Sequence, residues 1–306
     1  MTAVQGLDWI GADWGTSNLR VWALDAAGRV LVRAESEDGM GRLDRAGFEP
    51  ALLRLVGGWL PAEGRTTVVA CGMVGSRQGW VEAPYRAVPC TPFGRGPLAR
   101  PETRDPRLSV HVIPGLRQDS PADVMRGEET QIAGYLVRNP GFDGVICLPG
   151  THTKWALVSA GEVVAFQTFM TGEIFALLTR QSVLRHSTGG AGWDGPAFAE
   201  AVSEGLSRPE RLAAALFALR AEALLHGLTP DRARARLSGL LIGSELAASR
   251  PFWLGQKVAV VGAERVAAAY AAALGQQALT VATAEVEPMT LAGLAAARSR
   301  IAEAIA

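Results

Sequence analysis

The chain has 306 residues, of which 30 are Lys or Arg and 30 are Asp or Glu, so its formal net charge is zero. This length exceeds what one ordinary core needs and suits two domains of roughly 150 residues each. The balanced charge gives no sign of a nucleic-acid partner, and no stretch approaches the roughly 20 apolar residues that cross a bilayer. We therefore expect a protein that acts on small molecules, with neither nucleic acid nor a membrane as a partner.

The cysteines favour a cytoplasmic location. Cys71, Cys90 and Cys147 are an odd number and lie far apart, and two of them fall inside the apolar strands VVACG and VICLPG. Cysteines in such positions behave as reduced core residues. The N-terminus also lacks the basic-then-apolar pattern of a signal peptide.

The first half of the chain is predicted to open with a three-stranded antiparallel meander. Apolar positions alternate in three short segments and turn residues separate them, which is typical of paired strands. The expected elements in this half are strands near 7–13, 18–25 and 29–36, a helix at 48–60 and a buried strand at 67–72. Residues 84–106 are rich in Pro, Gly and Arg and show neither period, which predicts an ordered loop or edge-strand region. Residues 119–127 are expected to form a loop that leads into a helix ending before Pro140.

The second half repeats the opening pattern. The pair Gly15-Thr16 matches Gly150-Thr151 at an offset of 135, and the next hairpin glycines, Gly28 and Gly161, differ by 133. Self-similarity of this kind predicts two domains of the same topology, residues 1–137 and 138–306. The alternative for the last helix is that it belongs to the first domain by packing back on it. After this second meander we expect helices near 173–184, 196–204, 208–226 and 230–248, a strand at 257–262 that runs into a helix, and a final helix at 289–305.

The turns of the two meanders are candidate phosphate sites. Gly15, Thr16 and Ser17 offer backbone N–H groups and hydroxyls with little obstruction, which makes a concave site for an anion. Asp13, just before this turn, adds a carboxylate that would hold Mg²⁺ directly or through water. The second turn, Gly150-Thr151-His152-Thr153, lacks the acid and is followed by Lys154. One such turn is commonly an ordinary hairpin, but two at matching places favour phosphate binding.

Other phosphate and metal motifs are absent from the sequence. There is no G-x-x-x-x-G-K-[ST], and the one formal G-x-G-x-x-A match, from Gly94 to Ala99, contains Pro97 and does not join a strand to a helix. No pair of the four histidines has metal-ligand spacing. The strand, turn and alanine-rich helix around Gly262 and Ala263 leave room for a flat adenine; a plain buried strand-helix unit is the alternative.

Taken in order, these segments resemble the phosphate-1, connect-1, phosphate-2 and adenosine segments of the sugar kinase, hsp70 and actin superfamily. Six strings closely resemble the 2-dehydro-3-deoxygalactonokinase family: DWGTSNLRVW, GMVGSRQGWVEAPY, DVMRGEETQIAGY, CLPGTHTKW, TFMTGEIFALL and GLLIGSEL, which span residues 12–245. The resemblance implies an α/β protein with two ribonuclease H-like domains of the actin/hexokinase type that face each other across a nucleotide-binding cleft.

The resemblance further implies that ATP and Mg²⁺ are used to phosphorylate a 2-keto-3-deoxy sugar acid, 2-dehydro-3-deoxy-D-galactonate, to its 6-phosphate in galactonate catabolism. The residues expected to bind ATP are Gly15, Thr16, Ser17, Gly150, Thr151, Lys154, Gly262 and Ala263, and Asp13 is the expected metal ligand.

The expected catalytic residues are Asp13, Glu128 and Glu129. Phosphoryl transfer needs a group that takes the proton of the attacking hydroxyl. Related sugar kinases place an acid directly after a glycine at the start of a helix, where this chain has Glu128 followed by Glu129, with Asp123 nearby. A glutamate here replaces the usual aspartate. The alternative for each acid is that it only favours the helix dipole.

The expected substrate-binding residues follow the strand at 67–72 in the string GSRQGW. Arg77 would pair with the substrate carboxylate through two parallel hydrogen bonds, Gln78 would bind hydroxyls beside Ser76, and Trp80 would cover the apolar face of the deoxy carbon. The alternative for Arg77 is a solvated loop charge. Arg126 and Lys154 are reserve candidates for the carboxylate, and residues 171–173 are expected to cap a helix rather than to touch ligand.

Two other functions remain open from the sequence. One is another phosphotransferase or a phosphatase of the same superfamily, against which the SRQGW loop argues. The other is a nonenzymatic actin-like ATP-binding regulator. The configuration of the substrate at C4 and the oligomeric state stay open, with a homodimer among the options.

Overall fold

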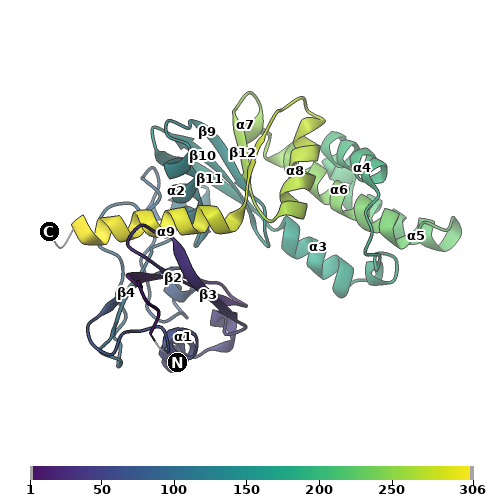
Figure 1. Ribbon diagram of the computed structural model, residues 1–306. Helices are drawn as coiled ribbons and strands as arrows, with labels where there is room; N and C mark the ends of the chain where they lie inside the picture. The colour runs from purple at the N-terminus through teal and green to yellow at the C-terminus, as the bar shows by residue number, and fades with distance from the viewer. Residues whose placement is uncertain (1–2, 304–306) are drawn as a thin grey trace. The chain divides into compact units, whose positions relative to one another are not determined.

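The structure is a computed structural model that describes residues 3–303 (Figure 1). Contacts divide the chain into two compact units. The first comprises Met1–Phe142, Ser159–Ala165 and Val286–Ala306, and the second comprises Asp143–Val158 and Phe166–Glu285. The boundary expected between residues 137 and 138 stays a prediction. No helix within residues 3–303 combines the length and apolar character that a membrane span requires.

The first unit is built on a five-stranded sheet in the order β3-β2-β1-β4-β6. Its strands are β1 (Trp9–Trp14), β2 (Leu19–Leu24), β3 (Val30–Ser36), β4 (Thr66–Gly72) and β6 (Leu108–Val112). The strands β1, β2 and β3 pair antiparallel, whereas β4 lies parallel to both β1 and β6. The predicted opening meander is confirmed.

The core of this unit collects large aromatic rings beneath the sheet. The helix α1 (Phe48–Val56) buries its apolar face against β1 and β4. The ring centroid of Trp14 lies 5.1 Å from that of Phe48 and 6.1 Å from that of Trp80. The helix is shorter than the predicted 48–60 because Gly57 and Gly58 follow it, and glycine is a poor helix former.

A second, small sheet corrects the expectation of a loop at 119–127. It has the order β5-β7-β8, with β5 (Arg86–Ala87), β7 (Leu116–Asp119) and β8 (Ala122–Met125). The strands β7 and β8 form an antiparallel hairpin around Ser120 and Pro121. Strands this short and this exposed lack the alternation of buried apolar residues that signals a strand. The strand β6 was likewise not predicted.

Two helices, α2 (Glu128–Arg138) and α9 (Val286–Glu303), contact each other through glycines in the first unit (Figure 1). A Cβ added at Gly134 would lie 1.8 Å from the carbonyl oxygen of Met289. A Cβ added at Gly293 would lie 1.9 Å from that of Thr130. The two backbones therefore touch, and α9 fixes the position of α2 from its first turn onward.

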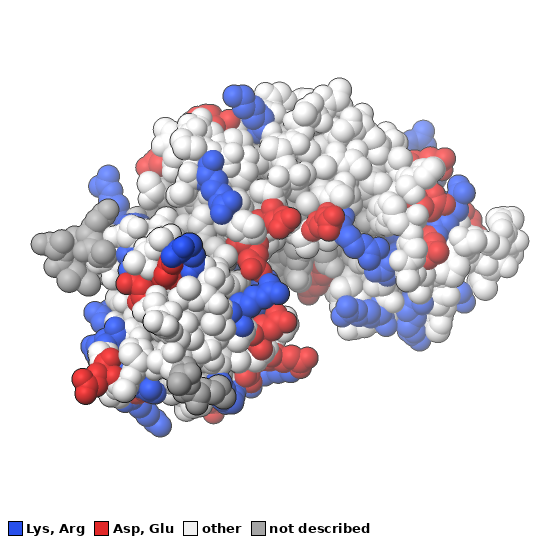
Figure 2. Space-filling model, viewed as in Figure 1, with Lys and Arg blue, Asp and Glu red and all other residues white. Residues whose placement is uncertain are grey.

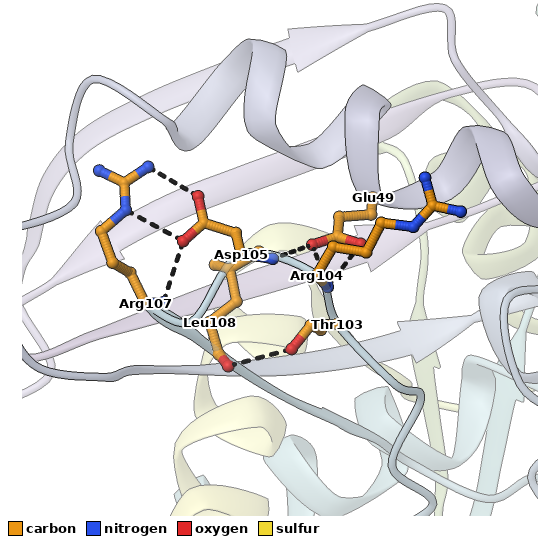
Figure 3. A network of polar contacts seen from close by, with 6 residues as sticks. All are labelled: Glu49, Thr103, Arg104, Asp105, Arg107 and Leu108. Atoms are coloured by element: carbon orange, nitrogen blue, oxygen red, sulfur yellow. Dashed lines mark hydrogen bonds and ion pairs between the residues drawn. The ribbon is translucent and has the colours of Figure 1, made fainter.

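The long irregular segment at 84–106 is anchored to α1 by one buried carboxylate (Figure 3). The two oxygens of Glu49 accept hydrogen bonds from the backbone N–H groups of Arg104 (2.8 and 3.0 Å) and Asp105 (2.7 Å). Asp105 in turn pairs with Arg107 at 2.7 Å. The expectation of an ordered loop here is confirmed, since a carboxylate that accepts several N–H groups fixes a loop without regular structure.

The second unit repeats the strand order of the first in the sheet β11-β10-β9-β12-β13. This sheet contains β9 (Gly144–Leu148), β10 (Thr153–Ser159), β11 (Glu162–Phe169), β12 (Val258–Val261) and β13 (Ala282–Ala284). The end of β10 and the first half of β11 fall in Ser159–Ala165, which the contacts place with the first unit. As in the first sheet, β9 is antiparallel to β10 and parallel to β12. The repeat inferred from the glycine offsets is thus a repeat of topology.

Helices surround this second sheet and make up most of its unit. They are α3 (Thr171–Arg180), α4 (Gly195–Ser207), α5 (Leu212–Leu225), α6 (Pro230–Ala248), α7 (Arg250–Trp253) and α8 (Glu264–Gly275). The crossing of α4 and α6 depends on glycines: a Cβ at Gly243 would lie 2.3 Å from the carbonyl oxygen of Val202. Apart from α7, these helices match the predicted ones, with ends that differ by a few residues.

Candidate functional site

The turn between β1 and β2 presents its N–H side outward. Its carbonyl side is occupied, because Met40 N–H donates to Gly15 O (3.0 Å) and Gly41 N–H donates to Thr16 O (2.9 Å). Thr16 and Ser17 are exposed, and within residues 3–303 no acceptor binds their backbone N–H groups. Gly39 lets residues 39–41 approach the turn this closely, because a Cβ at this position would lie 2.2 Å from the backbone of Ser17. Open N–H groups on a fixed turn form an anion site.

Asp13 stands at the end of β1, between two strands. In the sheet it lies opposite Arg20 on β2 and Cys71 on β4, so the three side chains share one face. Its carboxylate pairs with Arg20 at 2.6 Å and accepts a weak hydrogen bond from the Cys71 thiol at 3.9 Å. Burial raises the pKa of Asp13 above its usual value, and the Arg20 charge only partly offsets this.

A second acidic element lies beside Asp13 at the start of α2. Gly72, at the end of β4, and Gly127, just before α2, both have positive φ (91° and 105°), and a Cβ at Gly127 would lie 3.4 Å from the Gly72 Cα. Gly72 also lies beside Asp13, since its own Cβ would be 3.6 Å from the Asp13 Oδ1. These glycines let α2 begin next to Asp13.

Glu129 is fully buried in this first turn and is held by hydrogen bonds. Gly127 N–H donates to Glu129 Oε2 (2.6 Å) and the Thr130 hydroxyl donates to Glu129 Oε1 (2.9 Å). Burial, reinforced by the neighbouring charge of Glu128, raises the pKa of Glu129 to about 8. Glu128 itself is half-buried, and its Oε2 accepts a hydrogen bond from Arg126 N–H at 3.0 Å. The structure thus brings all three predicted catalytic acids to one part of the first unit.

Burial is the main reason that the Cys71 thiol stays protonated. Burial, together with the charges of Asp13 and Glu129, holds the pKa of the Cys71 thiol well above its usual range. The residue acts as a core thiol, as the sequence predicts.

The predicted substrate loop separates into exposed and buried residues. Arg77 and Gln78 are exposed, whereas Ser76 is buried and its hydroxyl has no partner within residues 3–303. Trp80 is only 7% exposed and packs in the core with Trp14 and Phe48. The role of Trp80 as a cover over the substrate stays a prediction; in this structure its ring packs in the core beneath the loop.

Arg126 lies under the same loop. Its Nη2 donates to the Ala83 carbonyl at 2.8 Å, and its guanidinium stacks on the ring of Tyr85 at 4.4 Å. Its Nε and Nη1 are buried and have no hydrogen-bond acceptor in the part of the chain described. Arg126 is thus placed to support residues 75–85 from below.

The turn between β9 and β10 is held like the first turn. Gly150, Thr151 and His152 are exposed. The Thr151 carbonyl accepts a hydrogen bond from Glu173 N–H at 2.9 Å, and a Cβ at Gly172 would lie 2.0 Å from the Gly150 carbonyl oxygen. The start of α3 therefore occupies the carbonyl side of this turn, as residues 39–41 do in the first unit. No sequence pattern predicts the supporting role of Gly39 or Gly172.

Two further predicted ATP residues lie beside this second turn. Gly262, at the end of β12, would bring a Cβ to 3.0 Å from Pro149, which directly precedes Gly150, and Ala263 then caps α8. Lys154 differs from them: its side chain is nearly buried and already interacts within the protein.

A buried polar network behind the turn was missed by the sequence analysis. Glu245 on α6 accepts hydrogen bonds from Trp155 Nε1 (2.8 Å) and from the Tyr270 hydroxyl (2.8 Å). The Tyr270 hydroxyl also lies 3.0 Å from the Thr153 hydroxyl. Burial raises the pKa of Glu245, and these hydrogen bonds oppose the rise. The carboxylate ties β10 to α6 and α8, which fixes the strand that follows the turn.

The donor set of the first unit fits Mg²⁺. Within residues 3–303 no three His, Cys, Asp or Glu side chains form a group that could hold a metal ion by themselves. Mg²⁺ commonly uses one or two protein carboxylates, with waters and phosphate oxygens completing its shell. Asp13 suits this mode, because its burial disfavours a lone negative charge and a nearby cation would offset that cost.

Together these features define a class of protein. Two sheets of one strand order, each with a Gly-Thr turn between its first two strands, form the ribonuclease H-like fold of actin-type ATPases and sugar kinases. A crystal structure of component A of the (R)-2-hydroxyglutaryl-CoA dehydratase of Acidaminococcus fermentans shares this fold, with a TM-score of 0.50 at 12% identity over 96% of this chain and 98% of that chain.

Residues 13–297 match the profile of the 2-keto-3-deoxy-galactonokinase family, and the chain belongs to this family. It is 36% identical over 297 residues to a probable 2-dehydro-3-deoxygalactonokinase of Rhizobium meliloti (strain 1021), covering 94% of this chain and 96% of that protein. It is also 36% identical over 251 residues to the 2-dehydro-3-deoxygalactonokinase of Escherichia coli (strain K12), covering 80% and 81% of the two chains. A crystal structure of a Sinorhizobium meliloti protein assigned as a 2-dehydro-3-deoxygalactonokinase superposes with a TM-score of 0.86 at 35% identity, covering 96% of this chain and 99% of that chain.

Proposed function

We propose that this protein transfers the γ-phosphoryl group of ATP to the 6-hydroxyl of 2-dehydro-3-deoxy-D-galactonate, giving the 6-phosphate and ADP. One observation carries the proposal: two turns of the same plan have their carbonyls held and their N–H side open, and the first lies beside Asp13 and the acidic start of α2, whereas at the second the Glu173 carboxylate binds His152. Family membership supports it, as do the names of the two relatives.

The two turns would bind the phosphates of ATP. Thr16 and Ser17 in the first unit, and Gly150 and Thr151 in the second, would donate backbone and hydroxyl hydrogen bonds to phosphate oxygens. Gly262 and Ala263 would leave room for the adenine. We assign the buried Lys154 a supporting role in β10 rather than a phosphate contact.

Asp13 would hold Mg²⁺ from the first unit, directly or through water. When bound, the ion would neutralise charge on the phosphate oxygens during transfer. Arg20 would keep the Asp13 carboxylate in place through their 2.6 Å ion pair.

Glu128 is the proposed general base and Glu129 the residue that positions it. Both Glu129 oxygens already accept hydrogen bonds, and the side chain is fully buried, so it cannot reach a substrate hydroxyl. Glu128 is half-buried and starts the same helix. The Glu129 carboxyl fixes the Gly127–Thr130 turn, and α9 fixes α2 behind it.

The substrate carboxylate would pair with Arg77. This arginine is exposed, whereas Arg126 lies under the loop, where its Nη2 donates to the Ala83 carbonyl, its guanidinium lies over the Tyr85 ring, and its Nε and Nη1 have no acceptor among the described residues. A planar guanidinium matches a carboxylate with two parallel hydrogen bonds. Gln78, also exposed, would bind a hydroxyl, while the buried Ser76 would shape the loop.

The proposal is tested by following ADP formation with the keto sugar acid and with a neutral sugar analogue. Arg77→Ala should weaken binding of the keto acid by about 2 to 5 kcal/mol, the range for losing one partner of a desolvated charge pair. ATP affinity should stay near that of the wild type, and Arg77→Lys should restore only part of the loss. Arg33→Ala, at an exposed arginine of β3, is the matched control and should change nothing. Equal losses for the acid and the neutral analogue would instead assign the carboxylate to Arg126.

The location of the protein is part of the proposal. The three cysteines are free, and Cys71 and Cys147 are buried, which suits the reducing cytoplasm predicted from the sequence.

A further inference from the structure

The helix α5 has two apolar faces, of which its own unit covers one. Leu219 is fully buried, and Leu212 and Leu216 pack with it against a core formed by α4, α6 and residues 183–186. On the other side, Phe217, Leu224 and Leu225 are 65%, 66% and 74% exposed. A helix that is apolar all round is normally buried on all sides.

The charged residues of α5 are turned toward its own unit. The helix contains two, Arg220 and Glu222. Arg220 donates to the Ser187 hydroxyl at 3.2 Å, and Glu222 forms an ion pair with Arg236 on α6. The outer face of α5 therefore carries no charge, and the surface over α5 is white at the right-hand end of the molecule in Figure 2.

Three exposed residues and one half-buried alanine, Ala221, follow the spacing of a helix-helix seam. Ala214, Phe217, Ala221 and Leu224 are separated by three, four and three residues, which is the apolar repeat of helices that pack against each other. Small residues alternate with large ones along this seam. In an antiparallel pair of two α5 helices, Phe217 of one copy would lie opposite Ala221 of the other and Ala214 opposite Leu224, so large residues meet small ones and the surface is complementary to itself.

We propose that α5 docks against α5 of a second copy of this chain and forms a two-fold symmetric dimer. Phe217, Leu224 and Leu225 together expose on the order of 400 Å² of side chain per copy, given about 150 to 250 Å² for each large side chain. This is about half of what one partner contributes to a standard stable interface, about 800 Å². The apolar seam would be the core of that interface.

The oligomeric state of the full chain in solution tests the proposal. Light scattering coupled to size-exclusion chromatography should give twice the mass of one chain for the wild type. Phe217→Glu and Leu224→Glu place like charges at the two-fold seam and should raise the dimer dissociation constant roughly 100-fold or more. Leu254→Glu, at a residue that is 62% exposed outside α5, is the matched control and should remain dimeric.

A second measurement does not depend on disruption. A chain carrying Cys90→Ser, Phe217→Cys and Ala221→Cys should form covalent dimers under oxidation, whereas the chain with Cys90→Ser alone, in which the remaining Cys71 and Cys147 are buried, should not. A monomeric wild type at every concentration would overturn the proposal, and so would dimers that both Glu variants leave intact. Binding of a different protein to α5 of a monomeric chain would also overturn it.

Discussion

Replacing Glu129 by Gln should remove a pH dependence of stability that the buried carboxyl creates. The pKa of Glu129 is raised from 4.5 to about 8 in the folded protein. Between these two values the folded chain keeps a proton that the unfolded chain releases, so the wild type loses stability as pH rises. Each unit of pH costs about 1.4 kcal/mol while this difference lasts. Above the folded pKa of about 8 the loss is complete.

The variant lacks this loss because an amide does not titrate in this range. From pH 5 to pH 8 the free energy of unfolding of Glu129→Gln, relative to the wild type, should therefore rise by roughly 4 kcal/mol. Urea unfolding at several pH values, without Mg²⁺ or ATP, measures this difference. Parallel pH profiles for the two proteins would refute the assignment of a buried, protonated Glu129.

Glu128→Gln provides a matched comparison. Glu128 is the second cause of the raised pKa of Glu129, after burial. Removing its charge should lower the pKa of Glu129 and end the loss of stability at a lower pH, with the same sign of slope.

Three other changes test the remaining parts of the site. Asp13→Asn should lower turnover by roughly 10² or more while the melting temperature stays near that of the wild type, because the change removes charge where Mg²⁺ would be held; wild-type turnover would show that Asp13 is only a turn residue. Gly172→Ala should raise the KM for ATP at least about tenfold, because the added Cβ would lie 2.0 Å from the Gly150 carbonyl oxygen and displace the turn that would bind phosphate. Gly195→Ala is the control and should leave the KM unchanged, because a Cβ there meets nothing within 4 Å. Glu245→Ala should cost about 2 to 6 kcal/mol of stability by thermal melting, because it leaves the buried donors of Trp155 and Tyr270 without their acceptor, at about 1 to 3 kcal/mol each. A loss below that of Glu245→Gln would contradict the network.

The sequence predicted what depends on local patterns. Both meanders, their Gly-Thr turns and the position of Asp13 follow from alternating apolar residues and turn residues, which act over a few neighbours. The helices after residue 172 follow from their own composition in the same way. The hairpin of β7 and β8 was missed because its short strands lie largely exposed and bury little apolar surface.

The features that could not be predicted from the sequence depend on contacts between segments that are far apart in the chain. Gly39 and Gly172 support the turns by touching backbone more than 20 residues earlier in the chain. Their neighbouring residues do not distinguish them from other glycines. Two adjacent glutamates also looked alike, although Glu129 is fully buried and Glu128 is not. The packing of Trp80 against Trp14 in the aromatic core also could not be predicted from its place in a motif, and its contact with substrate stays a prediction.

The central claim is tested most directly by phosphorus NMR of the reaction of the full chain with MgATP and 2-dehydro-3-deoxy-D-galactonate. The account predicts a phosphomonoester at the 6-carbon that appears at the same rate as ADP. It also predicts that both signals are absent when the sugar acid is omitted. ADP that forms without the sugar acid, or a phosphate on a different hydroxyl, would contradict it.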